Sequence, residues 1–106
     1  MSKVDLTQYN KVHSARLGNA VTAVSDLIDK WEKYHSYNED DTITAVIYKP
    51  CPVKEVVKMF AEMIEAVAFS SGYIAYTEAI HKVRNEDEYA IHFRFYKQDN
   101  DNVDAE

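Results

Sequence analysis

The side chains best suited to chemistry in this chain are two histidines near its C-terminus. His81 and His92 lie in two strand-like segments, Tyr73–Arg84 and Tyr89–Lys97, which the loop 85–88 joins into a predicted hairpin. With a loop of these four residues, residues 84 and 89 face each other. Opposed residue numbers therefore sum to 173, and His81 faces His92. Cross-strand neighbours have Cβ atoms about 5 Å apart. Two imidazoles at this spacing could share a zinc or nickel ion, or respond to a pH of about 6.

A complete metal site needs three or four ligands, and this pair supplies two. Its neighbours in the predicted rows are Thr77 and Arg94, so we expect no bound metal and no cofactor. The same face of the hairpin could receive a peptide or a small anionic ligand, or could be ordinary exposed surface. The candidate ligand-binding residues are His81, His92, Arg94 and Tyr96.

The single cysteine, Cys51, lies between two prolines just before a predicted helix. A helix N-terminus lowers the pKa of a thiol, but no base can be placed beside this one from the sequence, so we expect an inert residue and no enzyme activity. One cysteine forms no intramolecular disulfide, which is typical of a cytoplasmic protein.

The charged residues are clustered along the chain. It has 12 basic and 18 acidic residues, for a net charge of −6, and acids gather without Lys or Arg at 39–41, 86–88 and 99–106. Such runs are usually solvated loops and tails, although rows of carboxylates can also imitate nucleic acid before a basic partner. Direct nucleic-acid binding is not expected, because the hairpin aromatics are needed for the core. The hairpin cations are Lys82, Arg84, Arg94 and Lys97.

The element that dominates the sequence is a predicted helix over Leu6–Tyr34, which no proline interrupts. Apolar residues recur along it at spacings of three and four, with polar exceptions at Asn10 and His13, and form a heptad-like seam. About 29 helical residues span on the order of 40 Å, which is more than a domain of this size needs. We therefore predict self-association through this helix. The candidate anchors are Leu17, Val24, Leu27, Trp31 and Tyr34.

The remaining segments complete a small α+β domain. A strand is predicted over Thr42–Lys49, and a helix over Pro52–Ser71 that stops at Gly72. The order is α-β-α-β-β, which predicts two layers: a three-stranded mixed sheet with a right-handed crossover and both helices on one face. The predicted core side of the hairpin is formed by Ile74, Tyr76, Tyr89, Ile91, Phe93 and Phe95. We expect one domain over residues 1–98 and an acidic disordered tail over 99–106.

The chain is rich in amphipathic rings, with eight tyrosines and one tryptophan. These residues are favoured at protein interfaces. No apolar run approaches the roughly 18 residues that span a bilayer, so no membrane partner is expected. We therefore predict a non-enzymatic interaction module whose partners are a second copy of itself and an unidentified protein. In its general character the chain resembles small acidic single-domain accessory proteins, such as those that phages encode to bind and block host factors, and this resemblance implies a regulatory or inhibitory role.

Overall fold

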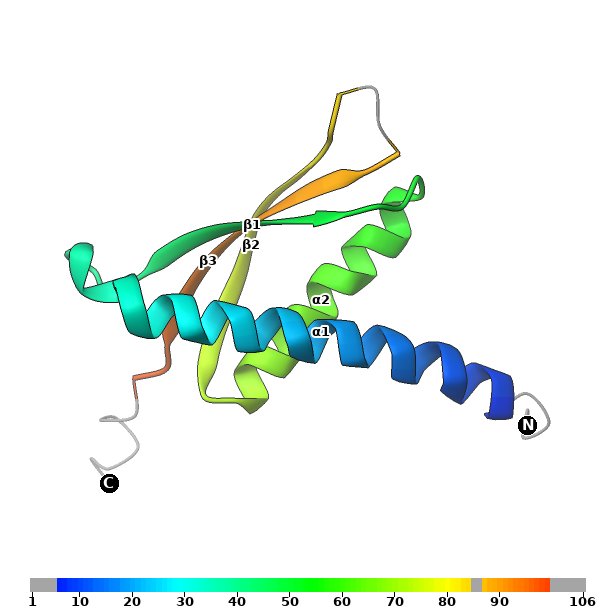
Figure 1. Ribbon diagram of the computed structural model, residues 1–106, viewed down its shortest axis with the longest axis horizontal. Helices are drawn as coiled ribbons and strands as arrows, with labels where there is room; N and C mark the ends of the chain where they lie inside the picture. The colour runs from blue at the N-terminus through cyan, green and yellow to red at the C-terminus, as the bar shows by residue number, and fades with distance from the viewer. Residues whose placement is uncertain (1–5, 85–86, 100–106) are drawn as a thin grey trace.

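The computed structural model describes residues 6–84 and 87–99, with side chains from residue 19 onward. Helix α1 (Leu6–Tyr34) and a short 3-10 turn, η2 (His35–Tyr37), lead into strand β1 (Ile43–Lys49). Helix α2 (Lys54–Ser70) and strands β2 (Tyr73–Lys82) and β3 (Tyr89–Lys97) follow (Figure 1). The predicted α+β class and the long first helix are confirmed. The tail predicted at 99–106 lies outside the described residues, apart from Asp99.

The three strands form one sheet in the order β1-β3-β2, and both neighbouring pairs are antiparallel. The predicted mixed sheet was therefore wrong. The crossover from β1 through α2 to β2 leaves a gap one strand wide, and β3 turns back into that gap instead of adding at the edge. This placement puts Ile91, Phe93 and Phe95, which are fully buried, at the centre of the sheet.

The hairpin register also differs from the prediction. Val83 donates its backbone N–H to the Glu88 carbonyl at 2.9 Å, so the loop spans 84–87 and opposed residues sum to 171 near the turn, as for Ile80 and Ile91. A β-bulge at Glu78 then lowers the sum to 170, as for Ala75 and Phe95.

The bulge decides which β2 side chains reach the core. Successive strand residues point to opposite faces, so one extra residue transfers all those beyond it to the other face. Tyr73 and Ala75 are buried, whereas Tyr76, predicted to lie in the core, is exposed and Ile74 is only half-buried. On β3 the predicted core side is confirmed, since Ile91, Phe93 and Phe95 are buried and Tyr89 packs against them.

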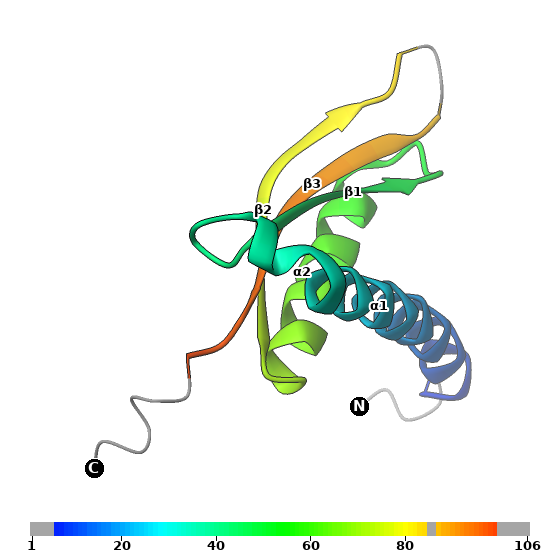
Figure 2. The ribbon, with the colours of Figure 1, turned by 60° about the vertical axis from the view of Figure 1, so that its left-hand side comes forward.

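Both helices lie on the same side of the sheet, as predicted (Figures 1 and 2). The core between the layers takes Val24 and Leu27 from α1, and Val57, Phe60 and Ile64 from α2. The N-terminal part of α1 continues beyond both α2 and the sheet (Figure 1). Neither helix, over the residues described, has the length and apolarity that crossing a membrane requires.

Trp31 fixes the end of α1 to the segment that leads into β1. Its indole N–H donates to the Asp41 carbonyl at 2.8 Å. Its ring stacks on His35 with centroids 3.8 Å apart and meets Tyr73 edge-on at 5.5 Å. Asp41 has a positive φ of 60°, a conformation that Asp tolerates better than most residues. One side chain thereby holds the helix, the connector and β2 together.

Gly72 lies in the turn between the end of α2 and the start of β2, where the sequence predicts that the helix stops. Its φ of +90° lies in the region that favours glycine. The Gly72 carbonyl accepts the backbone N–H of Gln98 at 3.0 Å, and the Gln98 side chain donates to the Phe69 carbonyl at 2.9 Å. The chain thus remains attached to this corner up to Gln98.

Candidate functional site

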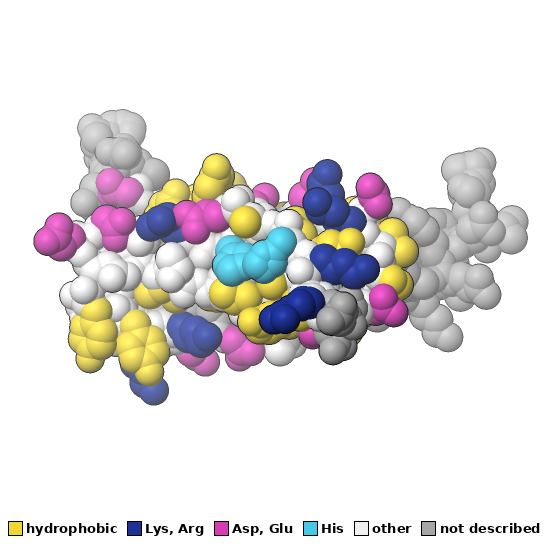
Figure 3. Space-filling view, turned by 90° about the horizontal axis from the view of Figure 1, so that it is seen from above, with side chains coloured by type: hydrophobic (Ala, Val, Ile, Leu, Met, Phe, Trp, Pro, Cys, Tyr) yellow, Lys and Arg dark blue, Asp and Glu magenta, His cyan; other side chains and the backbone are white. Residues whose placement is uncertain are grey.

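The sheet surface opposite the helices is not covered by any element that the structure describes (Figures 1 and 2). We call it the helix-free face. Its rows follow from the strand pairing: Val46, His92 and Ala79 form one, and Tyr48, Ala90 and His81 the next. Figure 3 looks onto this face and shows the histidines among hydrophobic side chains. The full set is Thr44, Val46, Tyr48, Ile74, Tyr76, Ala79, His81, Ala90, His92, Arg94 and Tyr96.

The two predicted histidines meet on this face, although their predicted pairing was wrong. His81 lies opposite Ala90, and His92 lies opposite Ala79. The rings nevertheless touch diagonally, with the two Nε2 atoms 3.4 Å apart and the ring centroids 4.8 Å apart. The shift of two residues near the turn keeps both side chains on the same face, so the pair survives the change of register.

The surroundings of this pair are poor in metal ligands. Val46, Ala79 and Ala90 are its row neighbours, and none of them offers a donor side chain. Across the described residues there is no group of three or more His, Cys, Asp or Glu side chains that could hold a metal ion. The pair can exchange a hydrogen bond, in which one neutral ring donates and the other accepts.

Arg94 lies on the helix-free face within a network of charged groups. Its Nε donates to the Glu78 carboxylate at 2.9 Å, and its Nη1 lies 3.8 Å from Asp40. The Thr42 hydroxyl and backbone N–H both donate to Asp40 Oδ1, at 2.8 and 3.2 Å. These bonds, led by the hydroxyl, lower the pKa of Asp40 below its usual value, and the ion pair with Glu78 raises the pKa of Arg94. Arg94 is therefore engaged with two carboxylates of its own chain.

The Asp40 network predicts a specific pH dependence. The pKa of Asp40 is lower in the folded chain than in the unfolded chain, so its charge stabilises the fold above a pH of about 4. That contribution is lost as the pH falls through the folded-state pKa. We expect the wild type to be more stable than Asp40→Asn at neutral pH, and the difference to disappear in acid. Urea unfolding of both chains from neutral to acidic pH measures this, and a constant difference would contradict it.

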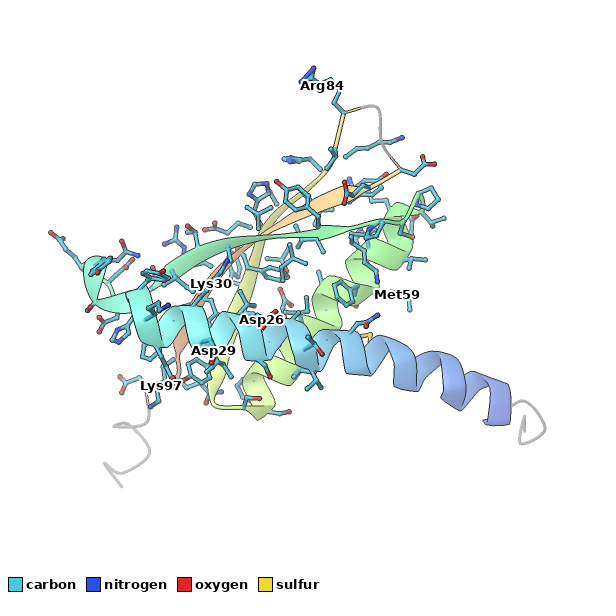
Figure 4. The ribbon with its side chains drawn as sticks, in the orientation of Figure 1. Asp26, Asp29, Lys30, Met59, Arg84 and Lys97 are labelled. Atoms are coloured by element: carbon cyan, nitrogen blue, oxygen red, sulfur yellow. The ribbon has the colours of Figure 1, made fainter. Side chains whose placement is uncertain are left out.

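The hairpin cations do not form one basic patch. Arg84 extends past the turn at one end of the hairpin, and Lys97 lies at the other end (Figure 4). Phe93 and Phe95 are fully buried and cannot stack on bases.

Cys51 is half-buried, and its thiol approaches the Val53 carbonyl at 3.7 Å.

The structure separates the five predicted self-association residues. Leu17 lies outside the described side chains. Val24 and Leu27 are each 2% exposed in the core of the chain itself, and Trp31 packs against that core. Tyr34 is exposed, with its ring 6.0 Å from that of Tyr37. Of the four described residues, only Tyr34 is exposed on the surface of the chain.

A groove runs between α1 and the free edge of β1. A hollow of about 460 Å³ is lined by Asp26, Leu27 and Lys30 on the helix, and by residues 45–47 on the strand. A second hollow of about 340 Å³ shares Lys30 and continues along residues 43–44 beside Tyr34 and Tyr37. Lys30 extends from α1 toward β1 (Figure 4). We call the two hollows the α1–β1 groove. No feature of the sequence pattern indicates it, because it depends on how far α1 lies from an edge strand.

A second feature that the sequence does not reveal is the support for the bulge. The Glu65 carboxylate on α2 accepts the backbone N–H of Thr77 at 3.0 Å. A bulge leaves backbone groups unpaired, and an acid on the helix beneath satisfies one here.

No family model, curated protein sequence or solved structure is significantly similar to this chain. The geometry alone therefore carries the functional argument.

Proposed function

We propose that this protein is a non-enzymatic interaction module that binds another protein on the helix-free face and self-associates with the help of α1. The observation that carries the proposal is the exposure of two tyrosines there: Tyr48 is 59% exposed and Tyr76 is 60% exposed. Val46 beside them is also exposed. The solvent side of a two-layer antiparallel sheet is commonly polar, so this composition is unusual for a face that meets only water.

The chemistry of the face supports a protein partner. Tyrosine is enriched at interfaces because its ring supplies a large apolar area while its hydroxyl keeps a hydrogen bond. The histidine pair can donate and accept hydrogen bonds on this surface, with His81 in the row of Tyr48 and His92 in the next row. Arg94 and Glu78 already form an ion pair, so a partner meets a largely neutral surface there. A regulatory or inhibitory role for such a module is part of the same proposal.

The test is affinity capture with the whole chain as bait in extract of the source organism. Tyr48→Ala together with Tyr76→Ala removes both rings from the helix-free face. Interface hot spots contribute about 2 kcal/mol or more each, so we expect the affinity for a captured partner to fall at least about 30-fold for each ring that is removed. Titration calorimetry with the purified partner measures the change.

A matched control is available on another surface. Phe69 is exposed near the C-terminal end of α2, and Phe69→Ala removes an aromatic ring of similar size. We expect it to capture the partner as the wild type does. Equal capture by all three baits would contradict the proposal, and so would a wild-type bait that retains no specific protein.

One observation favours the alternative that a small ligand binds here. His81, His92, Arg94 and Tyr96 do lie on one face, so a small anion could meet two imidazoles and a guanidinium. Arg94, however, is neutralised by Glu78 and Asp40, which weakens its attraction for an anion. The nucleic-acid mimic remains a further alternative, and most of the tail on which it rests lies outside the described residues.

A further inference from the structure

We propose that a second copy of the chain docks in the α1–β1 groove and pairs its own β1 with the free edge of β1, so that two sheets join into one of six strands. This inference deepens the self-association part of the proposed function and rests on it. It assigns that contact to the edge of β1 and the adjoining side of α1, rather than to the seam that faces the core.

The first observation is that the two edges of the sheet are unequally protected. On β2, the bulge at Glu78, the Glu65 carboxylate on the Thr77 N–H and the charges of Glu78 and Lys82 all hinder another strand. On β1, the sequence Ile43–Lys49 has neither proline nor acid, and its one charged residue, Lys49, is the last residue of the strand, outside the residues 43–47 that would pair. Within the described part of the chain, no hydrogen bond reaches its outer edge. Such an edge is a template for a further strand.

The second observation is that this edge is complementary to itself. In the antiparallel register that places Ala45 opposite Ala45 of the second copy, Ile43 faces Ile47, and both side chains lie on the core side. A two-fold axis through Ala45 keeps the helices of both copies on the same side of the joined sheet. The strand side chains that meet on the core side of the joint are then all apolar.

The third observation is the mixed charge of the α1 side of the groove, which we call the helical wall. Asp26 and Asp29 project from α1 beside Lys30 (Figure 4), and no ion pair involving them is formed among the described residues. In a two-fold arrangement the copies of α1 run antiparallel, so Lys30 of each can meet an aspartate of the other. A peptide whose charges all had one sign would be repelled either by the two aspartates or by Lys30. The wall therefore fits a second copy better.

The size of the interface requires this helical contribution. In this register the five residues 43–47 of β1 pair with the same residues of the second copy. They cover about 17 Å of strand, which by itself buries less than the roughly 1,200 Å² of a stable interface. Tyr34 and Tyr37 line the groove next to the strand and are exposed, so they would extend the contact from the strand to the end of the helix and its connector.

The test uses the full chain and two variants of opposite charge. Lys30→Glu makes the helical wall wholly acidic, and Asp26→Lys with Asp29→Lys makes it wholly basic. We expect the wild type to dimerise, and each variant to self-associate at least about tenfold more weakly. An equimolar mixture of the two variants should form a heterodimer of near wild-type affinity. Sedimentation velocity measures all four samples, and circular dichroism checks that the variants are folded.

Hydrogen exchange tests the strand pairing itself. Amides on the outer edge of β1 should exchange more slowly in the wild-type dimer than in Lys30→Glu. Equal exchange would overturn the strand pairing. A dimer that resists all the charge variants but is lost in Leu17→Glu would overturn the β1 site while leaving self-association through α1 intact. A wild type that stays monomeric at every concentration would overturn this inference together with self-association, without affecting partner capture through Tyr48 and Tyr76.

Discussion

Replacing Phe93 with alanine is expected to lower the free energy of unfolding by about 3–5 kcal/mol. Phe93 is fully buried at the middle of the central strand, between β1 and β2 and above both helices. A small domain has only about 5–15 kcal/mol of stability in total, so this variant is expected to lose a large part of it. Urea unfolding followed by circular dichroism measures the difference.

The matched control is Tyr76→Ala, in the neighbouring strand. The sequence pattern assigned both aromatic residues to the core, whereas the structure leaves Tyr76 exposed on the helix-free face. Its removal is expected to cost less than about 1 kcal/mol. Equal losses for the two variants would contradict the observed bulge and favour the unbulged hairpin register.

The second large effect is expected at Trp31, where alanine should cost about 3 kcal/mol. The indole stacks on His35, meets Tyr73 and donates a hydrogen bond to the Asp41 carbonyl. Its loss releases the connector between α1 and β1 and removes part of the packing of α1. Thermal and urea unfolding, followed by far-ultraviolet circular dichroism, measure the change without relying on the indole as a probe.

Trp31→Phe separates packing from hydrogen bonding. Phenylalanine retains an aromatic ring but cannot donate to Asp41, so about 1 kcal/mol should be lost with the hydrogen bond, and part of the packing with the smaller ring. If Trp31→Ala unfolds like the wild type, the indole does not hold the connector, and Trp31 could again be considered a contact for a second copy.

These stability effects bear on how self-association is interpreted. A seam that looks unpartnered in the sequence is partly used within the chain, since Val24 and Leu27 are buried and Trp31 packs against the core. Substitutions at these three residues would weaken a dimer mainly by unfolding the monomer. Tyr34, Lys30 and the edge of β1 can be changed with less damage to the core, so they report on assembly more directly.

The contact between His81 and His92 was predicted from an incorrect register. His81 and His92 share a face under the predicted sum of 173 and under the observed sum of 171, because both sums are odd and preserve the alternation of side chains. The exact opposition depends on where the loop begins, which a turn without an Asn-Gly or Asp-Gly signal does not specify. The contact therefore survives as a diagonal one.

The order of the elements, their bounds to within about two residues, the α+β class and the core side of β3 could all be predicted from the sequence. These features follow from local periodicity, from Gly72 at the end of α2 and from the absence of proline in α1, all of which act over a few residues. Three features could not be predicted in this way: β3 lies between β1 and β2, the strand bulges at Glu78, and α1 leaves a groove beside β1. Each of these depends on contacts between distant segments, such as Glu65 with Thr77, whose free energy is not encoded in the pattern of any one segment.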